Sequence, residues 1–287
     1  MITKAYEEFG MRQGKTLLFA HANGFPPSTY KVLLDELGKD WRVIAPHLRP
    51  LWQDLTEFQS QSDDRAVWQH MAMDLNDFIE KHQLAPAIYV GHSMGANVGV
   101  LAAQLKPHLY HQLILIEPVF LRQTIARIIR FGPAFLINKA PIVAKALNRP
   151  DVFLTLALAY DFHRSKRVFS GITDAVLWHY INAAFVPCDG GVKLLYSKYW
   201  EALMYSSVPN IWPYLKRSFV PISVLRGEFS NTVDTLAWKR WKALKNKQNL
   251  HENVRAINFT NTTHLLPLEQ PLEVAAQVTQ CVINGSI

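Results

Sequence analysis

Cysteine is scarce in this sequence, which excludes the small folds that disulfides hold together. The 287 residues include only Cys188 and Cys281. Two cysteines cannot form a disulfide framework, and these two lie too far apart in the sequence to form a zinc-binding pair. We therefore expect a reducing, cytoplasmic compartment.

Long apolar runs are missing as well. No run reaches the roughly 18 residues that a membrane-spanning helix needs, so an integral membrane protein is excluded. Residues 1–8 include Glu7 and Glu8 where a signal peptide would be apolar, so secretion through a signal peptide is not expected. With 49% hydrophobic and 18% charged residues, the chain has a globular composition.

Nucleic-acid-binding signals are also absent from the sequence. The net charge of +7 favours acidic partners in general. However, there is no run of alternating basic and aromatic residues and no nucleic-acid-binding motif, so we expect no nucleic acid partner.

Short β-branched runs alternate with amphipathic helical patterns in the first part of the chain. This alternation indicates a doubly wound α/β sheet whose strands are covered on both faces. The expected strands are Thr16–Ala20, Arg42–Ala45, Ala87–Val90 and Leu113–Ile116, and the expected helices are Tyr30–Leu37, Asp64–His82 and Ala96–Leu105.

The alternation stops at Glu117. The next hundred residues show no convincing strand, and segments such as 120–129, 142–147, 175–185 and 192–204 look helical. Strands return at 220–225 and 254–259, and a helix is expected over 272–282. We therefore predict a core of residues 1–117 and 214–287, interrupted by a helical cap of residues 118–213.

The segment Gly91–Gly95 has the sequence G-H-S-M-G, which is a G-x-S-x-G motif. An expected strand precedes it and an expected helix follows it, as a nucleophile elbow requires. Glycines on both sides allow Ser93 to occupy a sharp turn that lifts its hydroxyl out of the sheet. The start of the helix then places the Met94 N–H beside a developing oxyanion.

A serine hydroxyl needs a base, and His264 has the most suitable context among the 11 histidines. It lies on a loop between the last expected strand and the last expected helix, so it can reach the strand ends where Ser93 points. His21, His47, His92 and His108 are interpreted as structural.

Taken together, these segments resemble the α/β-hydrolase superfamily over nearly the whole chain. Phe19–Pro27 looks like its oxyanion loop, Gly91–Gly95 like its nucleophile elbow and His264–Pro271 like its histidine segment. The resemblance implies an α/β-hydrolase fold of about seven or eight mostly parallel strands, with the cap inserted after the sixth. It also implies a second oxyanion donor: Phe25 if Gly-Phe-Pro aligns directly, or Asn23 if His21 is the aligned histidine.

The third catalytic residue departs from the family pattern. The family usually carries an aspartate in a G-x-x-D setting after the seventh strand, but Ser230 stands at that position here. Glu117, at the end of the preceding sheet strand, is the preferred substitute, because some related hydrolases carry their acid there. Glu228 is the second candidate and Asp234 the third. An incomplete triad, and a role for Glu117 in pairing with a basic residue, stay open.

A serine nucleophile implies acyl transfer, and no metal or organic cofactor is expected. We predict a serine hydrolase that cleaves a carboxylic ester, or a related acyl bond, of a small or medium apolar substrate. Two alternatives stay open: a carbon–carbon bond hydrolase acting on ring-fission diketones, and a catalytically silent binding protein of the same fold.

The cap sequence is apolar and basic. Residues 118–150 contain six arginines and lysines but no acidic residue, with large apolar residues between them. The simplest interpretation is an amphipathic lid with a solvated basic face, over a mainly hydrophobic acyl pocket. An arginine that binds a substrate carboxylate, and peripheral contact of the basic cap with an acidic membrane surface, are left open.

Overall fold

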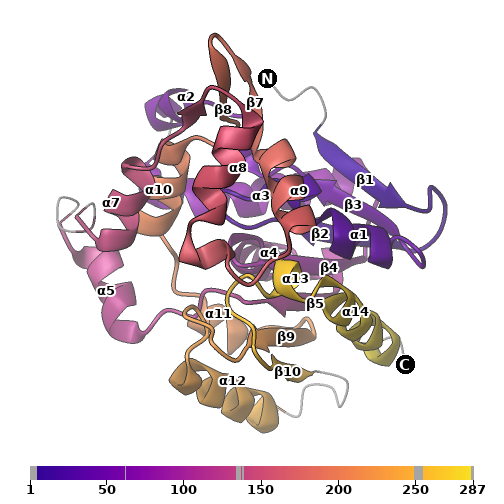
Figure 1. The fold of residues 1–287 in the computed structure, drawn as a ribbon. Coiled ribbons are helices and arrows are strands. Elements are labelled where there is room, and N and C mark those ends of the chain that lie inside the picture. Colours follow the sequence, from indigo (N-terminus) through magenta and orange to yellow (C-terminus); the bar gives the residue numbers. More distant parts are fainter. Residues whose placement is uncertain (1–4, 62, 134–136, 138, 249–254, 286–287) are drawn as a thin grey trace.

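The computed structural model describes residues 5–61, 63–133, 137, 139–248 and 255–285. Seven strands form the main sheet in the order β1-β3-β2-β4-β5-β9-β10, with helices on both sides (Figure 1). Only β1 is antiparallel to its neighbour. The strands are β1 (Tyr6–Gly10), β2 (Thr16–Ala20), β3 (Arg42–Pro46), β4 (Ala87–His92), β5 (Tyr110–Ile116), β9 (Ile222–Gly227) and β10 (Ala256–Phe259).

Alternating side chains of the central strands bury on opposite faces of this sheet. In β2, Leu18 belongs to the apolar cluster under α3 and α4, whereas Leu17 and Phe19 belong to the cluster under α1 and α14. Burial on both faces explains why the strands read as nearly continuous apolar runs. The helices of this core are α1 (Lys31–Leu37), α2 (Leu55–Gln61), α3 (Val67–Lys81), α4 (Met94–Leu105), α12 (Thr235–Gln248), α13 (Leu266–Glu269) and α14 (Pro271–Gly285).

Residues 118–213, which we call the cap segment, form a group of helices and a small sheet to the left of and above the main sheet in Figure 1. One cap helix, α9, packs against the short 3-10 helix η1 (Pro27–Tyr30) of the core. The cap helices are α5 (Gln123–Phe131), α7 (Pro141–Leu147), α8 (Leu156–Arg164), α9 (Asp174–Ala184) and α10 (Lys198–Ser206), and α11 (Trp212–Leu215) spans the boundary between the cap segment and the core.

The expectation of a purely helical cap is wrong in one respect. Strands β6 (Val152–Phe153), β7 (Phe185–Cys188) and β8 (Gly191–Leu194) form a second, antiparallel sheet in the order β6-β8-β7. The connection between β7 and β8 is the pair Asp189-Gly190, with Gly190 at φ +77°. Asp-Gly is a strong hairpin signal, because glycine adopts positive φ without strain. Strand β8 of this hairpin occupies the start of the helix expected over 192–204, so α10 begins only at Lys198.

The count of preceding strands also differs from the expectation. The cap segment follows the fifth strand along the chain, β5, rather than the sixth. The reason lies before β2, where the described residues 5–15 contribute the single antiparallel strand β1.

Among the described residues, no helix has both the length and the apolar character needed to cross a bilayer.

His21 and His163 are among the buried histidines whose charged form is disfavoured. His21 lies beneath the end of β2 with none of its surface exposed, and His163 lies in the cap among aromatic rings such as Phe169 and Phe185. Burial lowers the pKa of each imidazole to about 4. Both histidines are therefore neutral in the folded protein at pH values where they are protonated in the unfolded chain.

This burial predicts acid destabilisation. Between about pH 6.5 and 4 the unfolded chain binds protons that the folded chain does not, so the free energy of unfolding falls as the pH falls. His163→Phe should reduce this slope by up to about 1.4 kcal/mol per pH unit, because one proton is no longer taken up. Urea unfolding at several pH values measures the slope, with the exposed His108→Phe as control; an unchanged slope in His163→Phe contradicts the prediction.

Candidate active site

Ser93 occupies a strained turn between β4 and α4. Its φ of +53° is rare for a residue with a side chain, and it caps α4 at the amino-terminal end. The two motif glycines permit this turn by their small size. A Cβ on Gly91 would lie 2.7 Å from the Gly95 carbonyl oxygen, and a Cβ on Gly95 would lie 2.3 Å from the Ala20 carbonyl oxygen. The sequence pattern G-x-S-x-G is therefore explained by close backbone approach on both sides of Ser93.

The imidazole of His264 lies between Ser93 and Glu117. Its Nε2 is 2.9 Å from Ser93 Oγ, and its Nδ1 is 3.2 Å from Glu117 Oε2. The carboxylate can only accept a hydrogen bond, so Nδ1 carries the ring proton and Nε2 presents its lone pair to the serine hydroxyl. The structure thus brings together the three residues that the sequence singled out as nucleophile, base and acid.

Glu117 is held in place by groups that the sequence did not point out. It is fully buried at the end of β5, with φ +49°. The Gly227 N–H donates to its Oε1 at 2.6 Å, and the hydroxyls of Ser230 and Thr232 both donate to its Oε2. A buried carboxylate is costly unless such donors surround it, and these three hydrogen bonds offset the cost of its burial.

Thr232 also lies beside the imidazole. Its Oγ1 is 3.0 Å from His264 Nδ1 and 3.0 Å from Glu117 Oε2. Because the threonine proton goes to the carboxylate, its oxygen accepts from Nδ1–H, which is shared between Thr232 and Glu117. The sequence signal that could have found this cluster is Ser230, a hydroxyl at the position where the family pattern has its aspartate.

The other two acid candidates are not near His264. Glu228 is exposed, and its carboxylate accepts from the Asn261 N–H at 3.0 Å. Asp234 accepts from the Ala237 N–H at the start of α12 and pairs with Arg122 at 2.7 Å. Among the candidates considered, only Glu117 therefore contacts the base.

The backbone N–H groups around Ser93 define the candidate oxyanion hole. Met94 is the first residue of α4, and among the described residues its N–H has no hydrogen-bond partner. The Phe25 N–H, expected as the second donor, instead donates to the Ala22 carbonyl at 3.2 Å. The Asn23 N–H has no partner within the described part of the chain, so this turn favours the alternative donor, Asn23, over Phe25.

The cap segment covers this turn. The Asn23 side-chain amide donates to the Glu201 carbonyl of α10 at 3.1 Å, and the hydroxyl of Tyr196 contacts Met94 Sδ at 3.6 Å. The Phe25 ring packs against the ring of Tyr180, with centroids 5.1 Å apart. Two cap tyrosines, Tyr180 and Tyr196, therefore pack next to the candidate oxyanion hole.

One cap arginine lies in this covering layer, but it already has an anionic partner. Arg149 Nη2 is 2.5 Å from Glu201 Oε2, and both side chains are largely buried. Burial raises the pKa of the Glu201 carboxyl, and the positive charge of Arg149 opposes that rise. The charge of Arg149 is therefore balanced inside the protein rather than directed at a substrate carboxylate.

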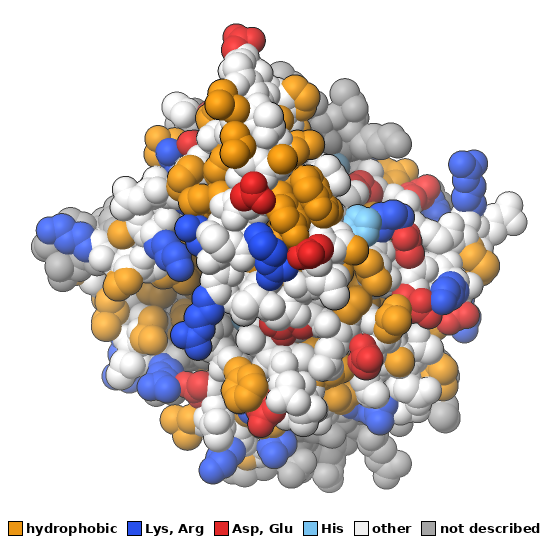
Figure 2. Space-filling view, viewed as in Figure 1, with side chains coloured by type: hydrophobic (Ala, Val, Ile, Leu, Met, Phe, Trp, Pro, Cys, Tyr) orange, Lys and Arg blue, Asp and Glu red, His pale blue; other side chains and the backbone are white. Residues whose placement is uncertain are grey.

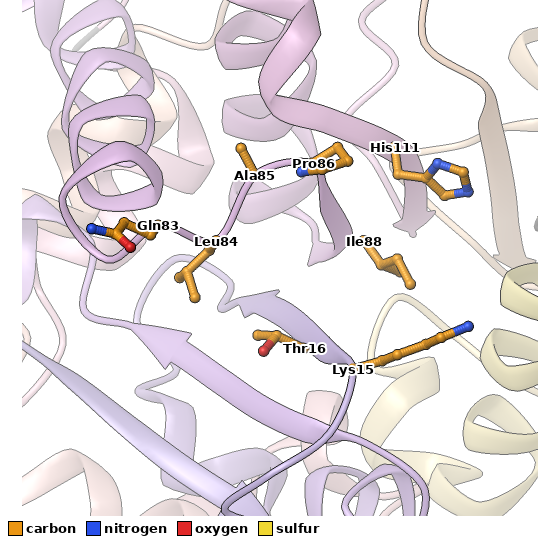
Figure 3. A pocket seen from close by; sticks show the side chains of 8 residues that line it. All are labelled: Lys15, Thr16, Gln83, Leu84, Ala85, Pro86, Ile88 and His111. Atoms are coloured by element: carbon orange, nitrogen blue, oxygen red, sulfur yellow. The ribbon is translucent and has the colours of Figure 1, made fainter.

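One hollow in the surface lies outside the candidate site. This hollow, of about 410 Å³, is lined by Lys15, Thr16, Gln83, Leu84, Ala85, Pro86, Ile88 and His111 (Figure 3). It lies where β2 and β4 begin, whereas Ser93 follows the end of β4. No cluster of three or more histidine, cysteine, aspartate or glutamate side chains suited to a metal ion occurs among the residues that the structure describes.

Comparison with known proteins places this geometry in a family. Residues 17–277 match the model of the Alpha/beta hydrolase family. Over 107 residues the chain is 29% identical to a probable esterase of Oryza sativa subsp. japonica, an alignment that covers 35% of this chain and 37% of the relative. Over 116 residues it is 31% identical to "Type I acyl-CoA thioesterase mpaH" of Penicillium roqueforti (strain FM164), covering 36% of this chain and 26% of the relative. The chain thus matches well under half the length of these curated relatives.

Similarity of structure extends much further than similarity of sequence. The crystal structure of E-2-(acetamidomethylene)succinate hydrolase superimposes with a TM-score of 0.80 at 19% identity, covering 97% of this chain and 94% of that one. At this identity the likeness concerns the fold alone. With a family match over 17–277 and a sheet that carries Ser93, Glu117 and His264 at its strand ends, this chain belongs to the Alpha/beta hydrolase family.

Proposed function

We propose that the protein is a serine hydrolase that cleaves a carboxylic ester of a small or medium apolar substrate through an acyl-enzyme intermediate. The observation that carries the proposal is the 2.9 Å contact between His264 Nε2 and Ser93 Oγ, with Nδ1 of the same ring directed at Glu117. This is the arrangement in which an imidazole can remove the serine proton.

In the first half-reaction His264 takes the proton of Ser93 as Oγ attacks the carbonyl carbon of the ester. Glu117 stabilises the resulting imidazolium, and the Met94 N–H, with a second N–H from the Asn23–Phe25 turn, stabilises the oxyanion. His264 then gives the proton to the leaving alkoxide, so an alcohol departs and Ser93 is acylated. In the second half-reaction water attacks the acyl-enzyme, its proton passes through His264 to Ser93, and the carboxylic acid is released.

The aromatic layer over the candidate oxyanion hole supports an apolar acyl group. Phe25, Tyr180 and Met94 are apolar or aromatic side chains that pack beside this turn, and the nearby charges of Arg149 and Glu201 are paired with each other. The same chemistry cleaves thioesters, and the similarity to the Penicillium acyl-CoA thioesterase favours them as a second substrate class. Ring-fission diketones, cleaved at a carbon–carbon bond, form the third class for a substrate panel.

Ser93→Ala tests the nucleophile. Wild-type protein should react covalently with a fluorophosphonate probe and hydrolyse p-nitrophenyl esters of short and medium acyl length. Ser93→Ala should lose labelling completely and lose esterase activity by several orders of magnitude, because no other hydroxyl contacts His264 Nε2 among the described residues. A folded wild-type protein that neither labels nor turns over any of the three substrate classes would instead support the silent binding protein.

Glu117→Gln tests the acid. The amide preserves the shape of the side chain but cannot stabilise the imidazolium, so we expect kcat to fall by about 10²- to 10⁴-fold. Glu228→Gln serves as the matched control, because the exposed Glu228 carboxylate binds the Asn261 N–H instead of the base, and its kcat should stay close to that of wild type. Equal activity of Glu117→Gln and wild type would remove Glu117 from the mechanism.

A double variant tests whether the carboxylate can move. Ser230 Oγ donates to the same Glu117 oxygen that faces His264, so an aspartate at position 230 reaches the neighbourhood of Nδ1. Glu117→Gln combined with Ser230→Asp should recover at least tenfold of the activity that Glu117→Gln loses. Glu117→Gln combined with Ser230→Ala, which adds no carboxylate, should recover none; equal rates for the two double variants would contradict the idea.

We further propose that the exposed side of α5 contacts anionic lipid surfaces. Ile125 and Ile128 lie one turn apart on this helix and are 44% and 57% exposed. Arg127, Lys139 and Lys145 are also exposed. Figure 2 shows several Lys and Arg side chains on the left side of the view, where Figure 1 places α5 and α7. An exposed apolar stripe flanked by cations is the pattern of helices that lie at a membrane interface.

Vesicle flotation measures this contact. The protein should bind vesicles rich in phosphatidylserine more strongly than phosphatidylcholine vesicles, and raised salt should weaken the binding. Replacing Ile125 and Ile128 together by serine should reduce binding several-fold, whereas Leu236→Ser, at an exposed leucine of α12, should not. Equal binding of both lipids, or equal losses in both variants, would refute the contact.

A further inference from the structure

A series of buried hydrogen bonds connects Ala22 with the backbone of His264. Ala22 precedes the Asn23–Phe25 turn of the candidate oxyanion hole, which we call the oxyanion turn. The contacts among Ser93, His264 and Glu117 do not use these hydrogen bonds. The Ala22 N–H donates to Tyr30 Oη at 3.2 Å, Tyr30 Oη is 2.8 Å from His92 Nδ1, and His92 Nε2 is 2.9 Å from the His264 carbonyl oxygen. The side chains of Tyr30 and His92 are completely or almost completely buried.

The partners at the two ends fix every proton in this series of hydrogen bonds. The His264 carbonyl can only accept, so His92 Nε2 carries the ring proton. Burial, reinforced by the neighbouring His264 ring, holds the pKa of His92 well below its usual range, so Nδ1 has only a lone pair. Tyr30 therefore donates its proton to Nδ1, and its oxygen accepts from the Ala22 N–H. All three hydrogen bonds therefore donate in the direction from Ala22 toward His264, and each polar atom involved has a partner.

The place of this series of hydrogen bonds in the fold connects the parts that must align in a reaction. Ala22 comes directly before the oxyanion turn, Tyr30 ends η1, and His92 directly precedes Ser93. His264 lies on the loop between β10 and α13, and 24% of its side chain is exposed. The bond from His92 anchors that loop by its main chain and leaves the imidazole free to contact Ser93 and Glu117.

We propose that Tyr30 and His92 are positioning residues that hold the base of the site in register with the nucleophile and the oxyanion turn. With the opposite tautomer of His92, a lone pair on Nε2 would face the lone pairs of the His264 carbonyl and repel the loop. Tyr30 disfavours this tautomer, because its hydroxyl proton would then lose its acceptor, the Nδ1 lone pair. The inference rests on the proposed hydrolase function, because the alignment that these hydrogen bonds maintain is that of Ser93 and His264.

Tyr30→Phe removes the donor without changing the shape of the ring. We expect kcat for p-nitrophenyl ester hydrolysis to fall about 5- to 10-fold with KM unchanged, because alignment for the reaction is lost but substrate contacts are not. Tyr110→Phe is the matched control: it removes a buried tyrosine hydroxyl that donates to Asn76 Oδ1 at 2.8 Å, at the opposite end of the sheet. Both variants should lose comparable stability, and only Tyr30→Phe should lose kcat.

Two substitutions of His92 separate donation from packing. Glutamine can place its Nε2–H near the position of the imidazole Nε2–H, so His92→Gln should keep most of the donation to the His264 carbonyl. His92→Leu fills space but cannot donate. We expect kcat to be several-fold higher in His92→Gln than in His92→Leu. Equal kcat in these two variants, or a kcat of Tyr30→Phe equal to that of Tyr110→Phe, overturns the proposal.

Nitrogen-15 NMR of the histidine rings provides a measurement that needs no substrate. The His92 signal, assigned by its loss in His92→Gln, should be that of a neutral Nε2–H tautomer from pH 5 to 8, and should shift toward the mixed-tautomer pattern in Tyr30→Phe. An Nδ1–H tautomer, or titration in this range, overturns the proposal. Failure of the proposed function has a different signature: wild-type protein would then not react with the fluorophosphonate probe, whatever the tautomer of His92.

Discussion

The site depends on one buried carboxylate. Glu117 has no exposed surface, and a buried charge is stable only where donors replace the water it has lost. Gly227, Ser230 and Thr232 supply those donors, all from β9 or the loop that follows it. The segment after β9, where the family pattern has an aspartate, thus supplies hydrogen-bond donors to a glutamate that follows β5. The contact between Glu117 and His264 then fixes the His264 tautomer that its proposed role as a base requires.

Parallel strands explain why residues so distant in sequence meet. Ser93 follows β4, Glu117 follows β5, Thr232 follows β9 and His264 follows β10. Carboxyl ends of parallel strands lie at one edge of a sheet, and active sites of open α/β sheets form there. Two of these positions, Ser93 and Glu117, adopt positive φ, so that the chain turns sharply as it leaves the sheet. The strained backbone at these two positions directs the side chains of the proposed nucleophile and the proposed acid.

Much of this arrangement could be predicted from the sequence, because strong local patterns specified it. The G-x-S-x-G motif between a strand and a helix located Ser93, and the position after the last strand located His264. The acid was harder to predict, because the sequence does not show which of Glu117, Glu228 and Asp234 directs its side chain at His264. Choosing Phe25 over Asn23 failed to anticipate the Ala22–Phe25 turn, since hydrogen-bond partners of a loop N–H are set by tertiary geometry. The sequence analysis did not predict the β7–β8 hairpin, although the pair Asp189-Gly190 is a hairpin signal.

The hydroxyl at position 230 has a consequence for how such sites can change during evolution. Ser230 Oγ lies within hydrogen-bonding distance of a Glu117 oxygen, so a second carboxylate at that position would face the first across the same short gap. Two like charges so close cannot both ionise, and one of them would have to retain a proton. Two ionised acids at these strand ends are therefore mutually exclusive, and transfer of the acid from one strand to the other passes through an intermediate with either no carboxylate or a pair that shares a proton.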